Sequence, residues 1–97
     1  MKPFRWSAEK SEVLKQSRGV SFEHIVVAVE GDGLLDIVEH PNKQKYPNQQ
    51  VLVVLVDGYV YLAPFVEEVD CFFLKTVIPS RKATRDYLQK GEPNAKR

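Results

Sequence analysis

The sequence predicts a single α+β domain, in which two N-terminal helices and one C-terminal helix lie on one face of a mostly antiparallel sheet of three or four strands. Two local patterns support this fold class. Serines that can act as N-caps precede short helical patterns, and an Asp57-Gly58 pair between two apolar runs indicates a β-hairpin. A chain of 97 residues fits one domain, 1–97, with an ordered core at about 4–90 and a flexible tail at 91–97.

The N-terminal helices are predicted from their caps. After a short strand or extended lead-in at 4–6, Ser7 caps a helix over about 8–17. Ser21 caps a second helix, which ends at Gly31-Asp32-Gly33. This helix carries an apolar stripe with i, i+3, i+4, i+7 spacing, formed by Phe22, Ile25, Val26 and Val29. We expect the stripe to face the sheet and Trp6 to lie in the core.

The remaining predicted strands are 34–39, 50–56, 59–66 and 71–78, and the second and third of these form the hairpin. Pro64 has no N–H for a ladder and marks a bulge or an edge. The run from Cys71 to Ile78 is largely apolar, which predicts a central strand buried on both faces. The residues expected in the core are Phe22, Ile25, Val29, Val53, Leu55, Leu74 and Val77.

Charge is balanced in total but uneven along the chain. The net charge is +1, so bulk charge does not indicate a nucleic-acid binder. Residues 81–97 hold six Lys or Arg and two acids, whereas residues 23–39 hold five acids and no Lys or Arg. This distribution predicts a basic working end and an acidic side.

Several classes of protein are disfavoured by composition. Cys71 is the only cysteine, which excludes an intrachain disulfide and indicates a reducing compartment. No apolar leader precedes the domain, and the longest aliphatic run, 51–56, is too short to span a membrane. We therefore expect a soluble, cytoplasmic protein. His24 and His40 have no metal-ligand spacing, so neither a metal nor another cofactor is expected.

The junction between the last strand and the C-terminal helix is the most informative segment. Ser80 is placed to cap a helix running from Arg81 to about Lys90, and Arg81, Lys82 and Arg85 fall in its first turns. Cations are unfavourable near a helix N-terminus, where the backbone carries partial positive charge. This arrangement indicates an anion site, and a phosphate is the expected anion. The alternative is a solvated charged face.

A second polar group lies in the proline-bounded loop 40–48 and the strand that follows it. It comprises His40, Lys43, Lys45, Tyr46 and Gln50. If the loop and the junction share one rim of the sheet, they form a basic cleft for a phosphodiester backbone, with Tyr46 able to stack on a base. The alternatives are solvated lysines, a Tyr46 ring packed on its own loop, and a His40 side chain that caps the strand end.

Three segments carry a resemblance that spans about residues 4–88. They are Phe4-Arg5-Trp6-Ser7-Ala8-Glu9-Lys10, Arg18-Gly19-Val20-Ser21-Phe22-Glu23 and Ile78-Pro79-Ser80-Arg81-Lys82-Ala83-Thr84. They resemble the BrnT family of toxins from type II toxin–antitoxin pairs, whose fold is similar to that of the RelE ribonucleases. Arg18 stands where that family usually has a histidine, and Ser7 where it usually has an aspartate.

The resemblance implies a metal-independent ribonuclease in which the 2′-hydroxyl of the RNA attacks the adjacent phosphate. Arg81 and Arg85 would hold that phosphate, Lys43 or Lys45 would stabilise the transition state, and His40 or Tyr46 would move a proton. The remaining RNA contacts would come from Ser80, Lys82 and Gln50.

The resemblance also implies partners. The expected ones are RNA or ribosome-bound mRNA, and a cognate antitoxin of the ribbon-helix-helix DNA-binding type that masks the basic site. Two alternatives remain open. One is a binding module that keeps the antitoxin surface without cleaving RNA, and the other is a structural protein whose exposed strand edge pairs with another chain.

Overall fold

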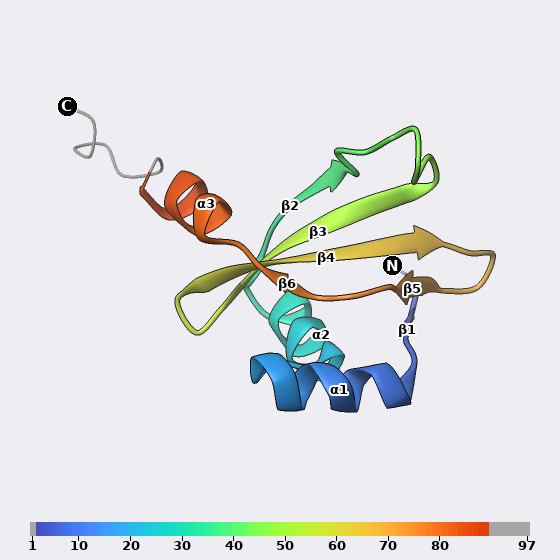
Figure 1. Cartoon of the computed structure of the whole chain (residues 1–97), viewed down its shortest axis with the longest axis horizontal. Coiled ribbons are helices and arrows are strands. Elements are labelled where there is room, and N and C mark those ends of the chain that lie inside the picture. Colours follow the sequence, from blue (N-terminus) through green and yellow to red (C-terminus); the bar gives the residue numbers. More distant parts are fainter. Residues whose placement is uncertain (1, 90–97) are drawn as a thin grey trace.

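The computed structural model describes residues 2–89 and has an α+β fold with a mixed sheet of six strands in that range (Figure 1). The elements in chain order are β1 (Phe4–Arg5), α1 (Ala8–Arg18), α2 (Phe22–Glu30), β2 (Leu34–Glu39), β3 (Gln49–Val56), β4 (Tyr59–Glu67), β5 (Phe72–Leu74), β6 (Ile78–Pro79), α3 (Arg81–Thr84) and the π-helical turn η1 (Arg85–Gln89). The sheet order is β1-β5-β4-β3-β2, and β6 pairs with β4 beside that path. All pairs are antiparallel except β1 with β5.

The predicted α+β class is therefore confirmed, but the sheet has more strands than the predicted three or four. The difference comes from short strands that carry little pattern of their own, since β1 and β6 have two residues each and β5 has three. The predicted tail at 91–97 and the predicted helix end at Lys90 lie outside the described residues. No helix within residues 2–89 combines the length and apolar character that crossing a membrane requires.

The N-caps of α1 and α2 follow the prediction. Ser7 Oγ accepts a hydrogen bond from the Lys10 N–H at 3.1 Å. Ser21 and His24 form a reciprocal capping box, in which the Ser21 N–H donates to His24 Nδ1 at 3.0 Å and the His24 N–H donates to Ser21 Oγ at 3.4 Å. α1 ends at the left-handed Gly19 (φ 73°), and Ser21 begins α2 only two residues later, so the two are separate helices.

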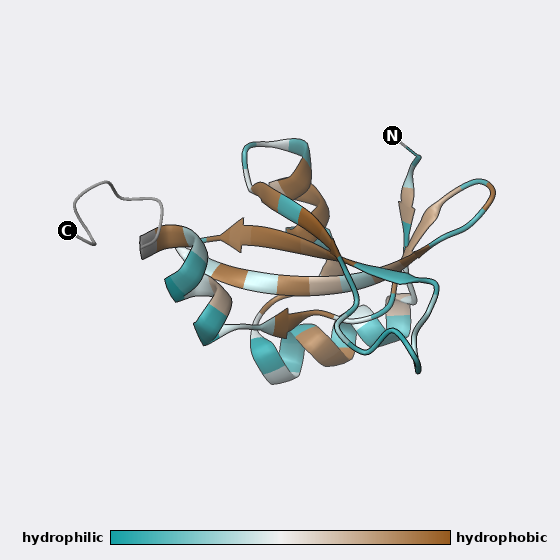
Figure 2. Cartoon of the chain, turned by 90° about the horizontal axis from the view of Figure 1, so that it is seen from above, coloured by the Kyte–Doolittle hydropathy of each residue, from teal (hydrophilic) through white to brown (hydrophobic). Residues whose placement is uncertain are grey.

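The β3–β4 hairpin is the centre of the fold. Asp57 and Gly58 both have positive φ (51° and 80°), as a two-residue type I′ turn requires. In the β3–β4 ladder every residue of β3 pairs with one of β4, from Val56 opposite Tyr59 to Gln49 opposite Val66. Figure 2 shows that the strands are largely hydrophobic and that the loop between β2 and β3 is hydrophilic.

The main core lies between this hairpin and the helices. Its buried residues are Leu14, Val20, Phe22, Ile25, Leu52, Val54, Ala63, Phe65, Leu74 and Val77. Of the residues predicted for the core, Val29 and Leu55 are only partly buried, as is Trp6. Side chains along a strand alternate between the two faces of the sheet. Leu52 and Val54 face the core under α1 and α2, so Leu55 lies on the opposite face.

The prediction of one central strand over 71–78 was wrong. The segment forms two short strands, β5 and β6, which pair with different parts of β4 and are separated by Lys75–Val77. Pro64 lies opposite this break, because β5 pairs with Phe65–Glu67 and β6 with Tyr61–Leu62. Pro64 has no N–H to donate on that side, although its carbonyl accepts from the Lys75 N–H at 2.8 Å. Pro64 thus neither bulges nor ends β4, but interrupts the neighbouring strand.

The C-terminal helical segment is attached to the start of β4 through one residue, Val60. The Ser80 N–H donates to Val60 O at 3.0 Å, and the Val60 N–H donates to Thr84 Oγ1 at 2.8 Å. The Thr84 hydroxyl in turn donates to Ser80 O at 2.7 Å. These bonds hold α3 beside the hairpin tip, at the end of the sheet far from the β2–β3 loop (Figure 1).

Candidate functional site

The loop between β2 and β3 is folded around Asn42. The Asn42 N–H donates to His40 Nδ1 at 3.0 Å, and Asn42 Oδ1 accepts from the Lys45 N–H at 3.1 Å. The Tyr46 N–H donates to Asn42 O at 2.9 Å, which closes the loop. His40 therefore uses one ring nitrogen to shape the loop, as the capping alternative expected.

Three of the predicted site residues meet in this loop. The rings of His40 and Tyr46 stack with centroids 4.5 Å apart, and Lys45 Nζ lies 5.4 Å from the Tyr46 ring centroid. The Tyr46 ring, which is partly buried, is thus occupied by neighbours from its own loop. This cluster brings a cation, an imidazole and a phenol together, but it contains no second cation.

Lys43 lies apart from that cluster and is paired. Its Nζ is 2.8 Å from Oε1 of Glu39, which lies four residues earlier in the chain. Hydrogen bonding to Lys43, and then its charge, lower the pKa of the Glu39 carboxyl below its usual value. Both side chains are largely exposed, so the pair is a surface contact rather than a buried one. Lys43 is consequently not a free cation.

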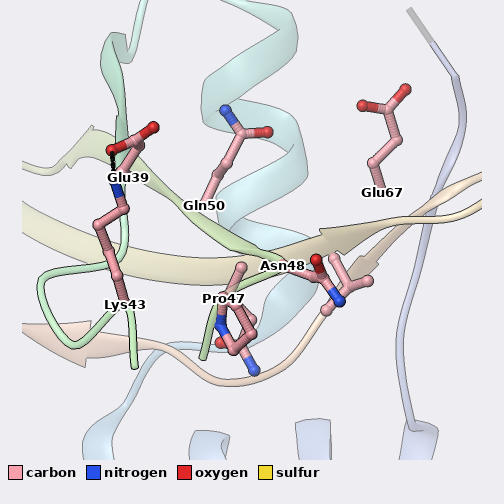
Figure 3. A pocket seen from close by; sticks show the side chains of 8 residues that line it. Glu39, Lys43, Pro47, Asn48, Gln50 and Glu67 are labelled. Atoms are coloured by element: carbon pink, nitrogen blue, oxygen red, sulfur yellow. Dashed lines mark ion pairs between the residues drawn. The ribbon is translucent and has the colours of Figure 1, made fainter. Parts of the chain in front are cut away.

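A hollow of about 420 Å³ opens next to this ion pair. Figure 3 shows Glu39, Gln50 and Glu67 pointing to one side of the strands, with Lys43 joined to Glu39. The complete lining is Glu39, Lys43, Pro47, Asn48, Gln49, Gln50, Val66 and Glu67. Two carboxylates and one ammonium make this an amide-rich, slightly acidic hollow, and Glu67 is itself paired with Lys2 at 2.8 Å. It does not have the charge of a phosphate site.

The junction is different in its charge. Ser80 Oγ accepts from the Ala83 N–H at 3.0 Å, which confirms the predicted cap. Arg81, Lys82 and Arg85 are all exposed. Lys82 Nζ is 2.9 Å from Asp86 Oδ2, and Arg85 Nε is 3.7 Å from Asp86 Oδ1. The Arg81 guanidinium forms no hydrogen bond or ion pair with any residue in the described range 2–89.

The loop and the junction do not share a rim of the sheet. Ser80 is bonded to Val60, which lies opposite Leu55, whereas the loop ends at Gln49. Gln50 is therefore five residues from that level of β3, or about 17 Å at roughly 3.4 Å per residue. The single basic cleft that was considered from the sequence is not assembled, because the two segments lie at opposite ends of the hairpin.

Aromatic residues that the sequence analysis passed over lie beside the junction. Tyr59 and Tyr61 flank Val60 and have ring centroids 5.7 Å apart with planes inclined by 66°. Within η1, Tyr87 Oη donates to Asp36 Oδ2 of β2 at 3.0 Å. Burial, and then this hydrogen bond and the Asp36 charge, raise the pKa of the Tyr87 hydroxyl. The i, i+2 spacing of the two tyrosines directly after the turn was the available signal, since it places both on one face.

Arg18 has a structural contact at the break between β5 and β6. Its Nη1 donates to Val77 O, which no strand partner satisfies. Within residues 2–89, no group of three or more His, Cys, Asp or Glu side chains is arranged to hold a metal ion. Comparisons with known protein families, with curated proteins and with solved structures find no match to this chain.

Proposed function

We propose that this protein is the toxin of a type II toxin–antitoxin pair with a RelE-like fold, and that it binds RNA at the junction between β6 and α3. The observation that supports this most directly is the exposed cation set of Arg81, Lys82 and Arg85 on a helical segment anchored to β4. Exposed cations next to aromatic rings are the usual components of a surface for single-stranded nucleic acid. Tyr59, which is partly buried, offers such a ring at the same end of the sheet, whereas its neighbour Tyr61 packs against the core.

In this proposal Arg81 is the principal phosphate ligand. Its guanidinium has no partner among the described residues, so binding a phosphate breaks no existing ion pair. Lys82 and Arg85 have to share their charge with Asp86 and contribute less. Metal-independent cleavage would proceed by attack of the RNA 2′-hydroxyl on the adjacent phosphate, with the arginines stabilising the negative charge that develops.

The position of the proton carriers favours a second candidate function, a partner of a cognate antitoxin that binds RNA without cleaving it. A general acid or base acts within about 3 Å of the proton that it moves. His40 and Tyr46 lie in the loop at the far end of the hairpin, so they are out of reach of a phosphate held by Arg81. Cleavage at the junction therefore requires a proton carrier other than these two.

The test separates binding from cleavage. Purified protein, freed of any copurifying partner, is incubated with single-stranded RNA and with ribosome-bound mRNA in EDTA, and both RNA decay and RNA retention are measured. Salt-sensitive retention that is lost in Arg81→Ala, but kept in Lys10→Ala, supports the RNA surface. Decay in addition supports the ribonuclease, whereas retention without decay supports the second candidate. Absence of both, together with normal growth on expression, would refute the proposal.

A further inference from the structure

β2 is the long open edge of the sheet. The order β1-β5-β4-β3-β2, with β6 also paired to β4, leaves the six-residue β2 at one side of the sheet and only the two-residue strands β1 and β6 at the other (Figure 1). Ladder alternation fixes which main-chain groups of β2 point outward. Asp36 and Val38 pair with Val53 and Val51 and bond inward, so Ile37 and Glu39 direct their N–H and C=O groups away from the sheet.

One of these outward main-chain groups, the Ile37 N–H, is hydrogen-bonded to a side chain. The Ile37 N–H donates to Asp36 Oδ1 at 2.8 Å, while the other oxygen of the same carboxylate accepts from Tyr87 Oη at 3.0 Å. No other described residue bonds to the outward groups of Ile37 or Glu39. The contact is local and exposed, so a strand that offers a main-chain carbonyl can replace the Asp36 carboxylate without disturbing the core.

The chemistry around this edge selects the partner. Ile37 is 42% exposed, which is high for an isoleucine on a strand. The segment 23–39, which includes β2, contains five acids and no Lys or Arg. A second copy of the chain is disfavoured, because two β2 strands paired edge to edge would set Asp36 and Glu39 against the same acids. A segment with cations and apolar residues in alternation is complementary to both features.

We propose that the β2 edge is a docking site for an extended, cation-bearing segment of a partner protein, which adds to the sheet as a further strand next to Ile37 and Glu39. Main-chain hydrogen bonds supply the attachment and Ile37 supplies an apolar contact. Asp36 favours a cation most directly, since the Glu39 carboxylate is already paired with Lys43. The displaced Asp36 carboxylate then becomes available to pair with a cation of the incoming strand. The proposal does not depend on RNA binding or cleavage, since it uses the edge of the sheet and none of the junction cations.

The probe is the capped peptide Lys-Val-Arg-Val-Lys-Val, added to the full-length protein while amide signals are followed by NMR. We expect saturable binding that shifts and protects the Ile37 and Glu39 amides. A peptide with Glu in place of every Lys and Arg should bind at least tenfold more weakly. A peptide of unchanged charge that is N-methylated at alternate residues should also lose at least tenfold, because it cannot form the ladder. Equal binding of the N-methylated peptide would overturn strand addition.

Two variants locate the site. Ile37→Pro removes the outward N–H, with its bond to Asp36, and the isoleucine side chain, but no N–H of the β2–β3 ladder. It should weaken peptide binding at least tenfold, whereas Ile37→Val, which keeps the N–H and an apolar side chain, should not. Glu39→Lys provides an independent test at an exposed position that does not threaten folding, and should weaken the cationic peptide by a similar factor. Undiminished binding to Glu39→Lys, or shifts confined to the junction, would refute the assignment to β2.

Discussion

The two ends of the β3–β4 hairpin carry similar numbers of cations but differ in how those cations are used. In the loop end, Lys43 is paired with Glu39 and Lys45 lies over the Tyr46 ring, so each cation has a neighbour from its own segment. At the junction end, Arg81 has no partner among the described residues. The comparison teaches that the density of cations in a sequence does not measure the charge offered to a ligand, because local pairing removes part of it.

The ends also differ in how they are anchored. The loop is held mainly by its own hydrogen bonds to Asn42, whereas the junction is bonded to the backbone of Val60, which is fully buried. A ligand at the junction therefore contacts a segment that is already fixed relative to the sheet. Four predictions test this contrast, and the largest expected effect comes first.

Removing junction cations should impair RNA activity far more than removing loop cations. Arg81→Ala should slow any RNA cleavage on the order of 100-fold, by analogy with the loss of about 2.7–4 kcal/mol when one oxyanion donor is removed. Lys43→Ala and Lys45→Ala should change it less than about twofold, since their charges are already engaged by Glu39 and Tyr46. Cleavage rates and growth on expression give the measurement. Equal losses at both ends would break the contrast.

The junction anchor should matter for stability. Thr84→Val keeps the shape of the side chain but leaves the Val60 N–H without its acceptor, so the free energy of unfolding should fall by about 1–3 kcal/mol. Thr84→Ser retains the hydroxyl and should cost less. Asn42→Ala, which loosens the exposed loop, should cost about 0.5 kcal/mol or less. Urea unfolding of the three variants decides whether the junction is the better anchored end.

Acid should release the loop pair first. Because the pKa of Glu39 is lowered in the folded protein, its pairing with Lys43 is present above the unfolded value, about 4.3, and is lost as pH falls through the folded value. A carboxyl NMR titration should therefore place Glu39 below an ordinary glutamate. In Lys43→Ala its midpoint should rise towards the ordinary value. An unchanged midpoint in that variant would show that Lys43 is not the cause.

Alkali should act at the junction end. The pKa of Tyr87 is raised, so the protonated hydroxyl stabilises the fold below the unfolded value, about 10, and this contribution is lost as pH rises through the folded value. The tyrosinate would face the Asp36 carboxylate instead of donating to it. Absorbance titration should show one late-titrating tyrosine that disappears in Tyr87→Phe and moves to lower pH in Asp36→Asn. A late component that persists in Tyr87→Phe would assign the shift to another residue.

Local signals in the sequence were sufficient for the elements that depend on neighbouring residues. Ser7, Ser21 and Ser80 cap helices because each has its acceptor oxygen next to free N–H groups, and Asp57-Gly58 forms a turn because both residues can take positive φ. The segment after Cys71 was mispredicted as one strand because its apolar residues do not reveal the break at Lys75–Val77: β5 lies between β1 and β4, as a central strand should, but β6 is a separate strand that pairs with β4 alone.

The loop and the junction do not form a common cleft because the predicted β3–β4 hairpin already separates them. A strand antiparallel to β4 must finish beside the start of β4, which is the hairpin tip, and Ser80 follows that point. The loop 40–48 precedes the start of β3, which lies beside the end of β4. Individual side-chain pairs, such as Tyr87 with Asp36, span 51 residues of sequence and had no local signal.

The interruption opposite Pro64 has a mechanical consequence for the molecule. The β4–β5 and β4–β6 ladders are separate, so tension applied to the C-terminal helical segment would load the two pairs that β6 makes, the bonds at Val60 and the Tyr87–Asp36 hydrogen bond before it reached β5. The segment Lys75–Val77 links the two ladders and is held by Lys75 on the sheet side and by Arg18 on the helix side. The C-terminal helical segment is therefore held to the sheet through β6, Val60 and Asp36, by contacts that are independent of the β4–β5 ladder.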